Sequence, residues 1–222
     1  MSIYLLFFYI KITYMLDILA IFIYNGIKHC NTTEVVQMKT SYTLKLAGLE
    51  RELPLCPLSD KLYIGAFVIF GDVELTCACA RDLIKIAPEH DVIITSESKG
   101  IPLVFEMARQ LGVNKYIVAR KMQKLYMSDI FACEVNSITT AKKQMLYLDG
   151  KDAEFMKGKR VLIVDDVIST GESLRAIEEL VAHAGGNVVG KMAILAEGDA
   201  KDRDDILFLE PLPLFDANGD AI

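Results

Sequence analysis

Five apolar segments of strand length divide the chain from residue 92 onwards. They cover residues 92–95, 116–119, 161–164, 188–195 and 206–209. The segment 161–164 is continuously aliphatic rather than alternating, which is typical of a strand buried on both faces of a parallel sheet. Helical segments separate the earlier runs. The pattern therefore predicts an α/β domain with a mostly parallel central sheet flanked by helices.

Three segments between these runs have the periodicity of amphipathic helices. The first covers residues 73–87, and its predicted buried face comprises Val73, Cys77, Ala80 and Ile84. The second covers residues 101–111, with Pro102 in its first turn and Gly112 at its end. The third begins beside Gly171, and its apolar stripe comprises Leu174, Ile177, Val181 and Ala184.

Shorter extended segments are predicted in the rest of the chain. Three of them precede the first helix, at residues 42–46, 53–57 and 62–70. Further along, residues 131–138 and 144–148 have the pattern of two hairpin arms, with a turn at 141–143. The residues that follow Phe215 are expected to form a loose tail.

The first residues of the chain differ from the rest in composition. Residues 2–24 are strongly apolar and are interrupted by Lys11 and Asp17. Each charge near the centre of a membrane helix costs roughly 2.5–3.5 kcal/mol, against about 0.3–0.6 gained per Leu, Ile or Phe, so the two terms nearly cancel. Residues 1–38 are therefore either a membrane anchor or docking helix, or upstream sequence ahead of a true start at Met38. The ordinary globular composition after Met38 favours the second interpretation, with residues 39–222 as the folded domain.

Composition and charge exclude several classes of protein. With 52% hydrophobic and 24% charged residues, the chain is that of a folded protein. Its net charge of −6 provides no basic surface for nucleic acid. The five cysteines include no C-x-x-C pair, and Cys77 and Cys79 lie in a predicted helix, where core thiols are expected. Such cysteine usage suits a reducing, cytoplasmic compartment.

The main chemical signal is a pair of acids placed after the strand 161–164. Asp165 and Asp166 are followed by a short loop rich in serine, threonine and glycine, and then by the third helix. The loop amides and the helix dipole favour a bound phosphate. A capping box between Ser169 and Glu172 would explain the loop. It would not explain two acids at the carboxyl end of a strand, where α/β folds bind their ligands.

These residues resemble the phosphoribosyl-pyrophosphate (PRPP) signature of type I phosphoribosyltransferases. The resemblance implies the type I phosphoribosyltransferase fold. This fold has a mostly parallel sheet, a small hood over the base and a flexible flap. It implies that Asp165 and Asp166 hold the ribose hydroxyls and, with Lys121, act in catalysis. The 5′-phosphate would be bound by Ser169, Thr170, Gly171, Glu172 and Ser173.

Two further loops are similar to pyrophosphate-binding loops of the same family. The residues that follow strand 92–95 match the adenine-type loop at Glu97, Ser98, Lys99 and Gly100. Arg120 and Lys121, with Lys124 three residues on, follow strand 116–119 and are candidates for the same ligand. A solvated basic run is the alternative for Lys124. The hairpin 131–148 resembles the family's flap, which would exclude water from the reacting ribose.

The resemblance implies that PRPP and a purine base are the substrates, with Mg²⁺ bound to PRPP and no side chain assigned as a metal ligand. Hypoxanthine-type enzymes carry an aspartate where this chain has Ser169, so adenine is the predicted base. Glu172 and Ser173 depart from the usual adenine-type signature, which has glycine and threonine at these two positions, and the flap is closer to the xanthine-type spacing. A xanthine/guanine-type enzyme therefore stays an alternative. Phe215 is a candidate to stack on the base, or else a core residue. Members of this family usually form dimers, so the resemblance implies a homodimer.

A second class of protein shares this signature without catalysis. Some transcriptional regulators of purine synthesis keep the fold and bind PRPP, and they usually carry a DNA-binding domain ahead of it. Residues 1–40 are too short and too apolar for such a domain. The sequence therefore favours an enzyme.

Overall fold

The structure is a computed structural model that describes residues 38–135 and 144–222. The predictions for the apolar stretch 1–37 and for the hairpin turn 136–143 lie outside these residues. All described residues belong to one unit, Met38–Ile222. Its elements in chain order are β1 (Ser41–Leu46), β2 (Leu49–Pro57), β3 (Tyr63–Gly65), α2 (Val73–Ile86), β4 (Val92–Ser96), α3 (Gly100–Leu111), β5 (Ile117–Ala119), β6 (Phe131–Val135), β7 (Gln144–Leu148), α4 (Gly150–Met156), β8 (Arg160–Ile168), α5 (Glu172–His183), β9 (Asn187–Glu197), the 3₁₀ helix η1 (Gly198–Asp202), β10 (Leu207–Leu212) and β11 (Leu214–Phe215).

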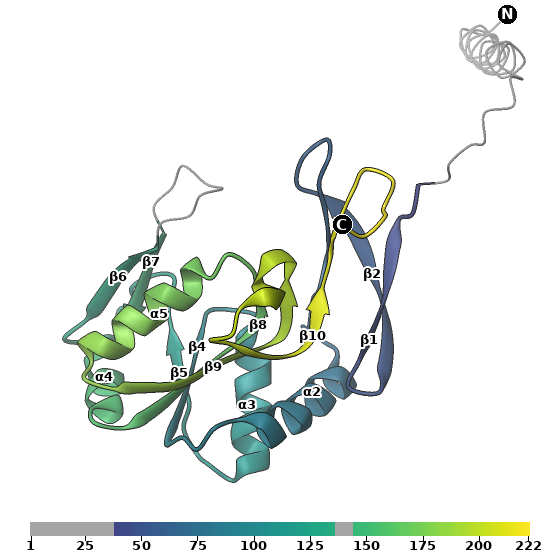
Figure 1. The fold of residues 1–222 in the computed structure, drawn as a ribbon. Helices are drawn as coiled ribbons and strands as arrows, with labels where there is room; N and C mark the ends of the chain where they lie inside the picture. The colour runs from purple at the N-terminus through teal and green to yellow at the C-terminus, as the bar shows by residue number, and fades with distance from the viewer. Residues whose placement is uncertain (1–37, 136–143) are drawn as a thin grey trace, which may run out of the picture. The chain divides into compact units, whose positions relative to one another are not determined.

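A five-stranded parallel sheet forms the centre of this unit (Figure 1). Its strand order is β10-β9-β8-β4-β5, and every neighbouring pair is parallel. The five strands are those predicted from the apolar runs, so the α/β prediction is confirmed. The order places β8, which carries the two acids, between β9 and β4.

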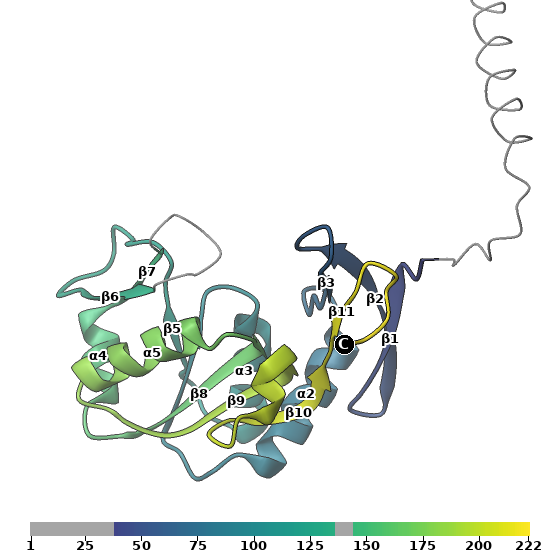
Figure 2. The ribbon, with the colours of Figure 1, turned by 45° about the horizontal axis from the view of Figure 1, so that its top comes forward.

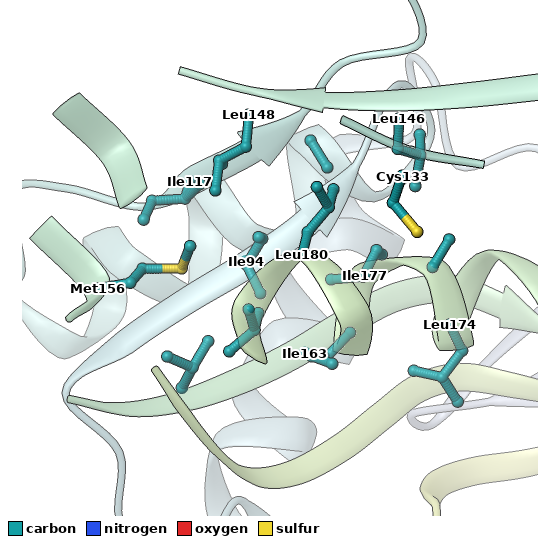
Figure 3. Close-up of a cluster of buried hydrophobic side chains, with 14 of the residues drawn as sticks. Ile94, Ile117, Cys133, Leu146, Leu148, Met156, Ile163, Leu174, Ile177 and Leu180 are labelled. Atoms are coloured by element: carbon teal, nitrogen blue, oxygen red, sulfur yellow. The ribbon is translucent and has the colours of Figure 1, made fainter. Parts of the chain in front are cut away.

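Helices cover both faces of the sheet, because alternate residues of each strand point to opposite sides. Val161 and Ile163 pack in a cluster with residues of α4, α5 and the β6–β7 hairpin (Figure 3). Leu162 and Val164 pack in a second cluster with α2 and α3. All four side chains are at most 1% exposed. Burial of each such side chain contributes about 1.5–3 kcal/mol, so β8 is anchored on both faces.

The rotation of α2 differs from the prediction. Asp72 caps the helix by accepting a hydrogen bond from the Leu75 amide at 3.0 Å, and its carboxylate pairs with Arg51 of β2 at 2.6 Å. These contacts turn the stripe Leu75, Cys79 and Leu83 toward the core. Val73 is 73% exposed, and of the predicted face Ala80 alone is buried. Apolar residues occur on more than one side of this helix, so spacing alone selected the wrong stripe.

The hood is a separate antiparallel sheet with the strand order β1-β2-β3-β11 (Figure 2). The predicted strand 62–70 is wrong in length, because β3 contains three residues. Beyond Gly65 the chain leaves the sheet and turns inward, where Phe67 is 5% exposed and Ile69 is fully buried. This inward turn brings the segment after β3 to the edge of the central domain.

The residues after Phe215 complete the hood, which contradicts the prediction of a loose tail. The Ile222 amide donates to the Leu214 carbonyl at 2.9 Å, and Phe215 forms a β-bridge with Ala221. The Phe215 side chain is 1% exposed, and its ring centroid lies 5.1 Å from that of Tyr42. Of the two roles considered for Phe215, the structure therefore favours the core residue.

The predicted hairpin is present as β6 and β7, which pair in register from Phe131↔Leu148 to Val135↔Gln144. Cys133, Leu146 and Leu148 are buried in the cluster beneath α5 (Figure 3). Within the described residues, no helix combines the length and the apolar character needed to cross a membrane.

The core role of Phe215 can be tested by replacing it with alanine. Phe215→Ala should lower the free energy of unfolding in urea by about 3–5 kcal/mol, the usual cost of removing a buried aromatic side chain. Phe105→Ala is the matched control, since Phe105 is 56% exposed and its loss should cost far less. If Phe215→Ala left stability unchanged and weakened binding of the base, Phe215 would be a base-binding residue and not a core residue.

Candidate active site at the open edge of β8

The two acids lie within β8, not beyond its end. The strand was predicted to finish at Val164, but it pairs with β9 as far as Ile168↔Ala196. Its pairing with β4 stops at Ile94↔Ile163. The reason for the longer strand is β9, which spans eleven residues and continues to offer hydrogen-bond partners. Beyond Ile163, therefore, β8 has one paired edge and one open edge, and Asp165 and Asp166 lie on this open stretch.

Short contacts fix the acid pair. The Asp166 amide donates to Asp165 Oδ1 at 2.9 Å, and the Ser96 hydroxyl approaches Asp165 Oδ2 at 3.4 Å. Lys99 Nζ lies 2.5 Å from Asp166 Oδ2, and the Asp166 side chain is 6% exposed. Burial, and then the neighbouring Asp166 charge, raise the pKa of Asp165 far above its ordinary value of 3.8. The site thus holds two adjacent carboxylates against their mutual repulsion, with one lysine as counter-ion.

The loop between β4 and α3 approaches the acid pair at Gly100. A side chain at this position would collide with Thr95 Oγ1 and would lie 3.2 Å from Asp165 Oδ1. Only glycine allows α3 to begin so close to the acids. Lys99, the residue before it, also donates to the Phe67 carbonyl at 3.3 Å. The predicted pyrophosphate loop therefore contacts both the acid pair and the segment that follows β3.

Glu97 connects this loop with the one after β5. Its carboxylate lies 3.3 Å from Arg120 Nη2 and accepts a hydrogen bond from the Lys121 amide at 3.0 Å. Arg120 and Tyr147 exchange backbone hydrogen bonds, both of 2.8 Å, which attach the β6–β7 hairpin to the same place. With Arg120 occupied by Glu97, the exposed Lys121 side chain is the cation that this second loop presents.

The loop between β8 and α5 has the form of a phosphate cradle. The N-cap of α5 is Gly171, with φ of 79°, and it provides no side-chain cap. The capping box that was considered as the alternative is thus absent, and no side chain caps the first amides of α5. Residues 169–173 of this loop line a cavity of about 70 Å³. The Arg203 guanidinium fills the space that a side chain at position 171 would need, and Asp205 holds it with bonds of 2.8 and 2.9 Å.

A larger cavity of about 440 Å³ joins these parts. Its lining includes most of the predicted site: Glu97, Ser98, Lys99, Lys121, Asp165, Asp166, Ser169 and Ser173. Thr170, Gly171 and Glu172 line the smaller adjoining cavity, and Gly100 lies against Asp165. Arg120, Lys124 and Phe215 are not among the lining residues of either cavity.

Two parts of the large cavity were not predicted as site residues. They are residues 64–68, which begin within β3 and continue beyond it, and Glu197 at the end of β9. Leu212, at the end of β10, begins the segment 212–215, which was predicted from the resemblance to form the wall against the base. Glu197 had a signal of its own, because it directly follows an apolar strand, as Asp165 does. Nothing in the spacing of residues 64–68 showed that this segment turns toward the acids.

The carboxylates of the described residues do not form a metal cage. No group of three or more His, Cys, Asp or Glu side chains in the described ranges could hold an ion. Phosphate oxygens are usual partners of a hard cation such as Mg²⁺, so a phosphate ligand could carry this ion with it. A sugar phosphate with an anionic leaving group would meet acids for its hydroxyls, amides for its phosphate and lysines for the leaving group.

Sequence comparison agrees with this arrangement. The family model of the phosphoribosyl transferase domain matches residues 77–212. A hypoxanthine/guanine phosphoribosyltransferase of Methanococcus voltae is 33% identical over 147 residues, which cover 66% of this chain and 72% of that one. The enzyme of the same name from Methanothermococcus okinawensis is 34% identical over 162 residues, covering 69% and 84%. The chain belongs to the phosphoribosyl transferase family.

Solved structures share the fold. An adenine phosphoribosyltransferase of Thermoanaerobacter pseudethanolicus matches with a TM-score of 0.55 and 24% identity, over 64% of this chain and 84% of that chain. One from Leishmania tarentolae matches with a TM-score of 0.56 and 18% identity, over 78% and 84%. The fold is therefore that of the type I phosphoribosyltransferases, as the signature predicted.

The raised pKa of Asp165 predicts how the stability of the ligand-free protein depends on pH. The folded state holds the proton more tightly than the unfolded chain does, so this contribution to stability is complete below pH 3.8 and is lost as the pH rises through the folded-state pKa. Relative to the native protein, Asp165→Asn should therefore gain more than about 1 kcal/mol between about pH 4 and pH 8, since one pKa unit corresponds to about 1.4 kcal/mol.

Urea unfolding of both proteins at several pH values measures this difference. Asp60→Asn is the control, since Asp60 is exposed and its replacement removes the same charge without relieving the buried pair. A stability difference for Asp165→Asn that does not change with pH would show that Asp165 titrates normally.

Proposed function

We propose that this protein transfers the phosphoribosyl group of PRPP to a purine base, releasing pyrophosphate and forming a nucleoside monophosphate. The observation that carries the proposal is the placement of Asp165 and Asp166 on the open edge of β8, in a cavity that also contains two lysines and adjoins the phosphate cradle. The family assignment and the curated relatives support the same reaction.

In this proposal each part of the cavity has one task. The acids accept hydrogen bonds from the ribose hydroxyls, and the amides at the start of α5 hold the 5′-phosphate. Lys99 and Lys121 neutralise the departing pyrophosphate. Bound to PRPP, Mg²⁺ would neutralise further phosphate charge. Lys99 Nζ lies 2.5 Å from Asp166 Oδ2, so binding would exchange this ion pair for contacts with substrate.

The sheet order supports a direct displacement at C1′. The loops after β4 and β5 lie on one side of β8, and the ends of β9 and β10 lie on the other. A leaving group held by Lys121 would therefore depart on the opposite side from a base placed near Leu212. Lys99 lies between the two, since its Nζ contacts both Asp166 and the Phe67 carbonyl. Positioning of both reactants would provide much of the catalysis.

Two observations bear on which purine is used, and they favour different bases. Ser169 lines the cavity at the position from which adenine was predicted. The curated relatives, at 33% and 34% identity, are named hypoxanthine/guanine phosphoribosyltransferases, which favours a 6-oxopurine. The adenine enzymes found by structural similarity are at most 24% identical in the pairs compared above and support the fold alone.

The proposal also includes a cellular setting. Cys56, Cys77, Cys79 and Cys133 are free thiols among the described residues, which suits a reducing cytoplasm. A homodimer and a folded domain at residues 39–222 remain part of the proposal. Light scattering would measure the first, and limited proteolysis the second.

Turnover with a panel of bases tests the reaction. The full chain would be incubated with PRPP, Mg²⁺ and, separately, adenine, hypoxanthine, guanine, xanthine, uracil and orotate, followed by measurement of nucleotide and pyrophosphate. Product from adenine alone would support the Ser169 argument, whereas product from hypoxanthine or guanine would support the relatives. Tight PRPP binding without turnover of any base would move the protein to the class of non-catalytic regulators.

Asp166→Asn tests the role of the acid pair. Because a hydrogen bond to a charged group contributes about 1.5–3 kcal/mol, the variant should lose about 10- to 100-fold in kcat/KM for PRPP. Circular dichroism should show an unchanged fold. Asp152→Asn is the control, since Asp152 pairs with Lys115 at 2.9 Å on a remote part of the surface. Native kinetics in Asp166→Asn would contradict the proposed site.

A further inference from the structure

Four carboxylates line the large cavity, and three of them have partners. Glu97 contacts Arg120 and the Lys121 amide, Asp165 contacts Ser96 and the Asp166 amide, and Asp166 pairs with Lys99. Within the described residues, no hydrogen bond or ion pair engages the carboxylate of the fourth, Glu197. This side chain is only partly exposed. A carboxylate on the cavity wall that none of the described residues engages is available to accept a hydrogen bond or a proton from a bound ligand.

The position of Glu197 identifies which part of the ligand it faces. Glu197 is the last residue of β9, and it pairs with Leu212 of β10. In the sheet order β9 lies on the opposite side of β8 from β4 and β5, and Lys121 follows β5. If pyrophosphate leaves on the side of Lys121, the attacking nitrogen approaches on the side of Glu197. Residues 64–68 and Leu212 provide a largely apolar wall at the same end.

The proposed reaction creates a need for a proton acceptor at this place. A neutral purine carries a proton on its imidazole ring, and the ring nitrogen that bonds to C1′ leaves the product without that proton. The neighbouring Ser169 is a poor acceptor, because a hydroxyl has no charge to neutralise. Lysines held as cations cannot accept a proton either. The other three cavity carboxylates are already engaged.

We propose, as an extension of the proposed transferase function, that Glu197 is the general base that takes the imidazole proton of the purine. The ring nitrogen forms its bond to C1′ while the bond from C1′ to the pyrophosphate oxygen breaks, and the electron pair leaves with pyrophosphate. The proton passes to a Glu197 carboxylate oxygen and then to solvent. In the reverse reaction, protonated Glu197 returns it to the departing base.

The surroundings of Glu197 suit this role. Burial raises the pKa of its carboxyl, which brings a general base closer to the working pH. The charged groups that act on it are Lys99, at the start of α3, which lowers this pKa, and Asp166, on β8, which raises it. Leu212 on β10 and the hood segment 64–68 contribute no charge to the cavity.

The pH dependence of Glu197→Gln and Glu197→Asp tests the proposal. Glutamine keeps the size of the side chain but cannot accept the proton, so kcat should fall about 100-fold or more. PRPP affinity should stay within about twofold, because Glu197 faces the base and not the sugar phosphate. The native decline of kcat toward acidic pH should be absent in Glu197→Gln. Aspartate should restore part of kcat together with this decline.

Glu210→Gln is the matched control, because Glu210 is an exposed carboxylate two residues before Leu212 on β10. It should have native kinetics. If Glu197→Gln kept the native kcat and the same decline of kcat toward acidic pH, the inference would be overturned. The transferase function would still stand, because it is tested by turnover of the native protein. Weaker PRPP binding with an unchanged kcat would also overturn it, because Glu197 would then be a substrate-positioning residue. Absence of turnover in the native protein would overturn both.

Discussion

The chemistry of this protein depends on the unequal pairing of β8 with its two neighbours. On one edge β9 remains paired as far as Ile168, and on the other β4 stops at Ile163. A strand held on one edge keeps its backbone rigid while the opposite edge is left for side chains and ligand. Asp165 and Asp166 are thus fixed in position without being enclosed. The loop at Gly100 comes close enough to close the gap only because glycine has no side chain there.

This arrangement also answers how an acidic protein can bind a strongly anionic ligand. The net charge is −6, and the site itself contains four carboxylates. Lys99 compensates Asp166, and Arg120 compensates Glu97, so much of the local positive charge is already paired. In the proposed function, backbone amides at the start of α5 would bind phosphate without adding any charge to be balanced. Substrate binding would then be an exchange of partners within the site, with little part for bulk electrostatic attraction.

Much of the site could be predicted because its parts are continuous in sequence. Each phosphate-binding loop directly follows an apolar strand and precedes a helix, so the motif contains both the residues and their local structure. The hood could not be predicted in this way, because β3 pairs with β11, about 150 residues away. The same limit applies to Glu197, which belongs to the cavity only through the order of the strands. The predicted face of α2 was wrong because apolar residues occur on more than one side of this helix, and the face that packs on the core is chosen by residues distant in sequence.

The pairing of β3 with β11 also affects the order of events during synthesis of the chain. A chain made from its N-terminus can form β1 and β2 early, but the hood sheet lacks an edge until residues 214–221 have been added. All five strands of the central sheet precede these residues. The acid pair and the phosphate loops are therefore synthesised before the last strand of the hood. A chain that ended before residue 214 would contain the elements proposed to hold PRPP but would lack the strand that completes the hood sheet.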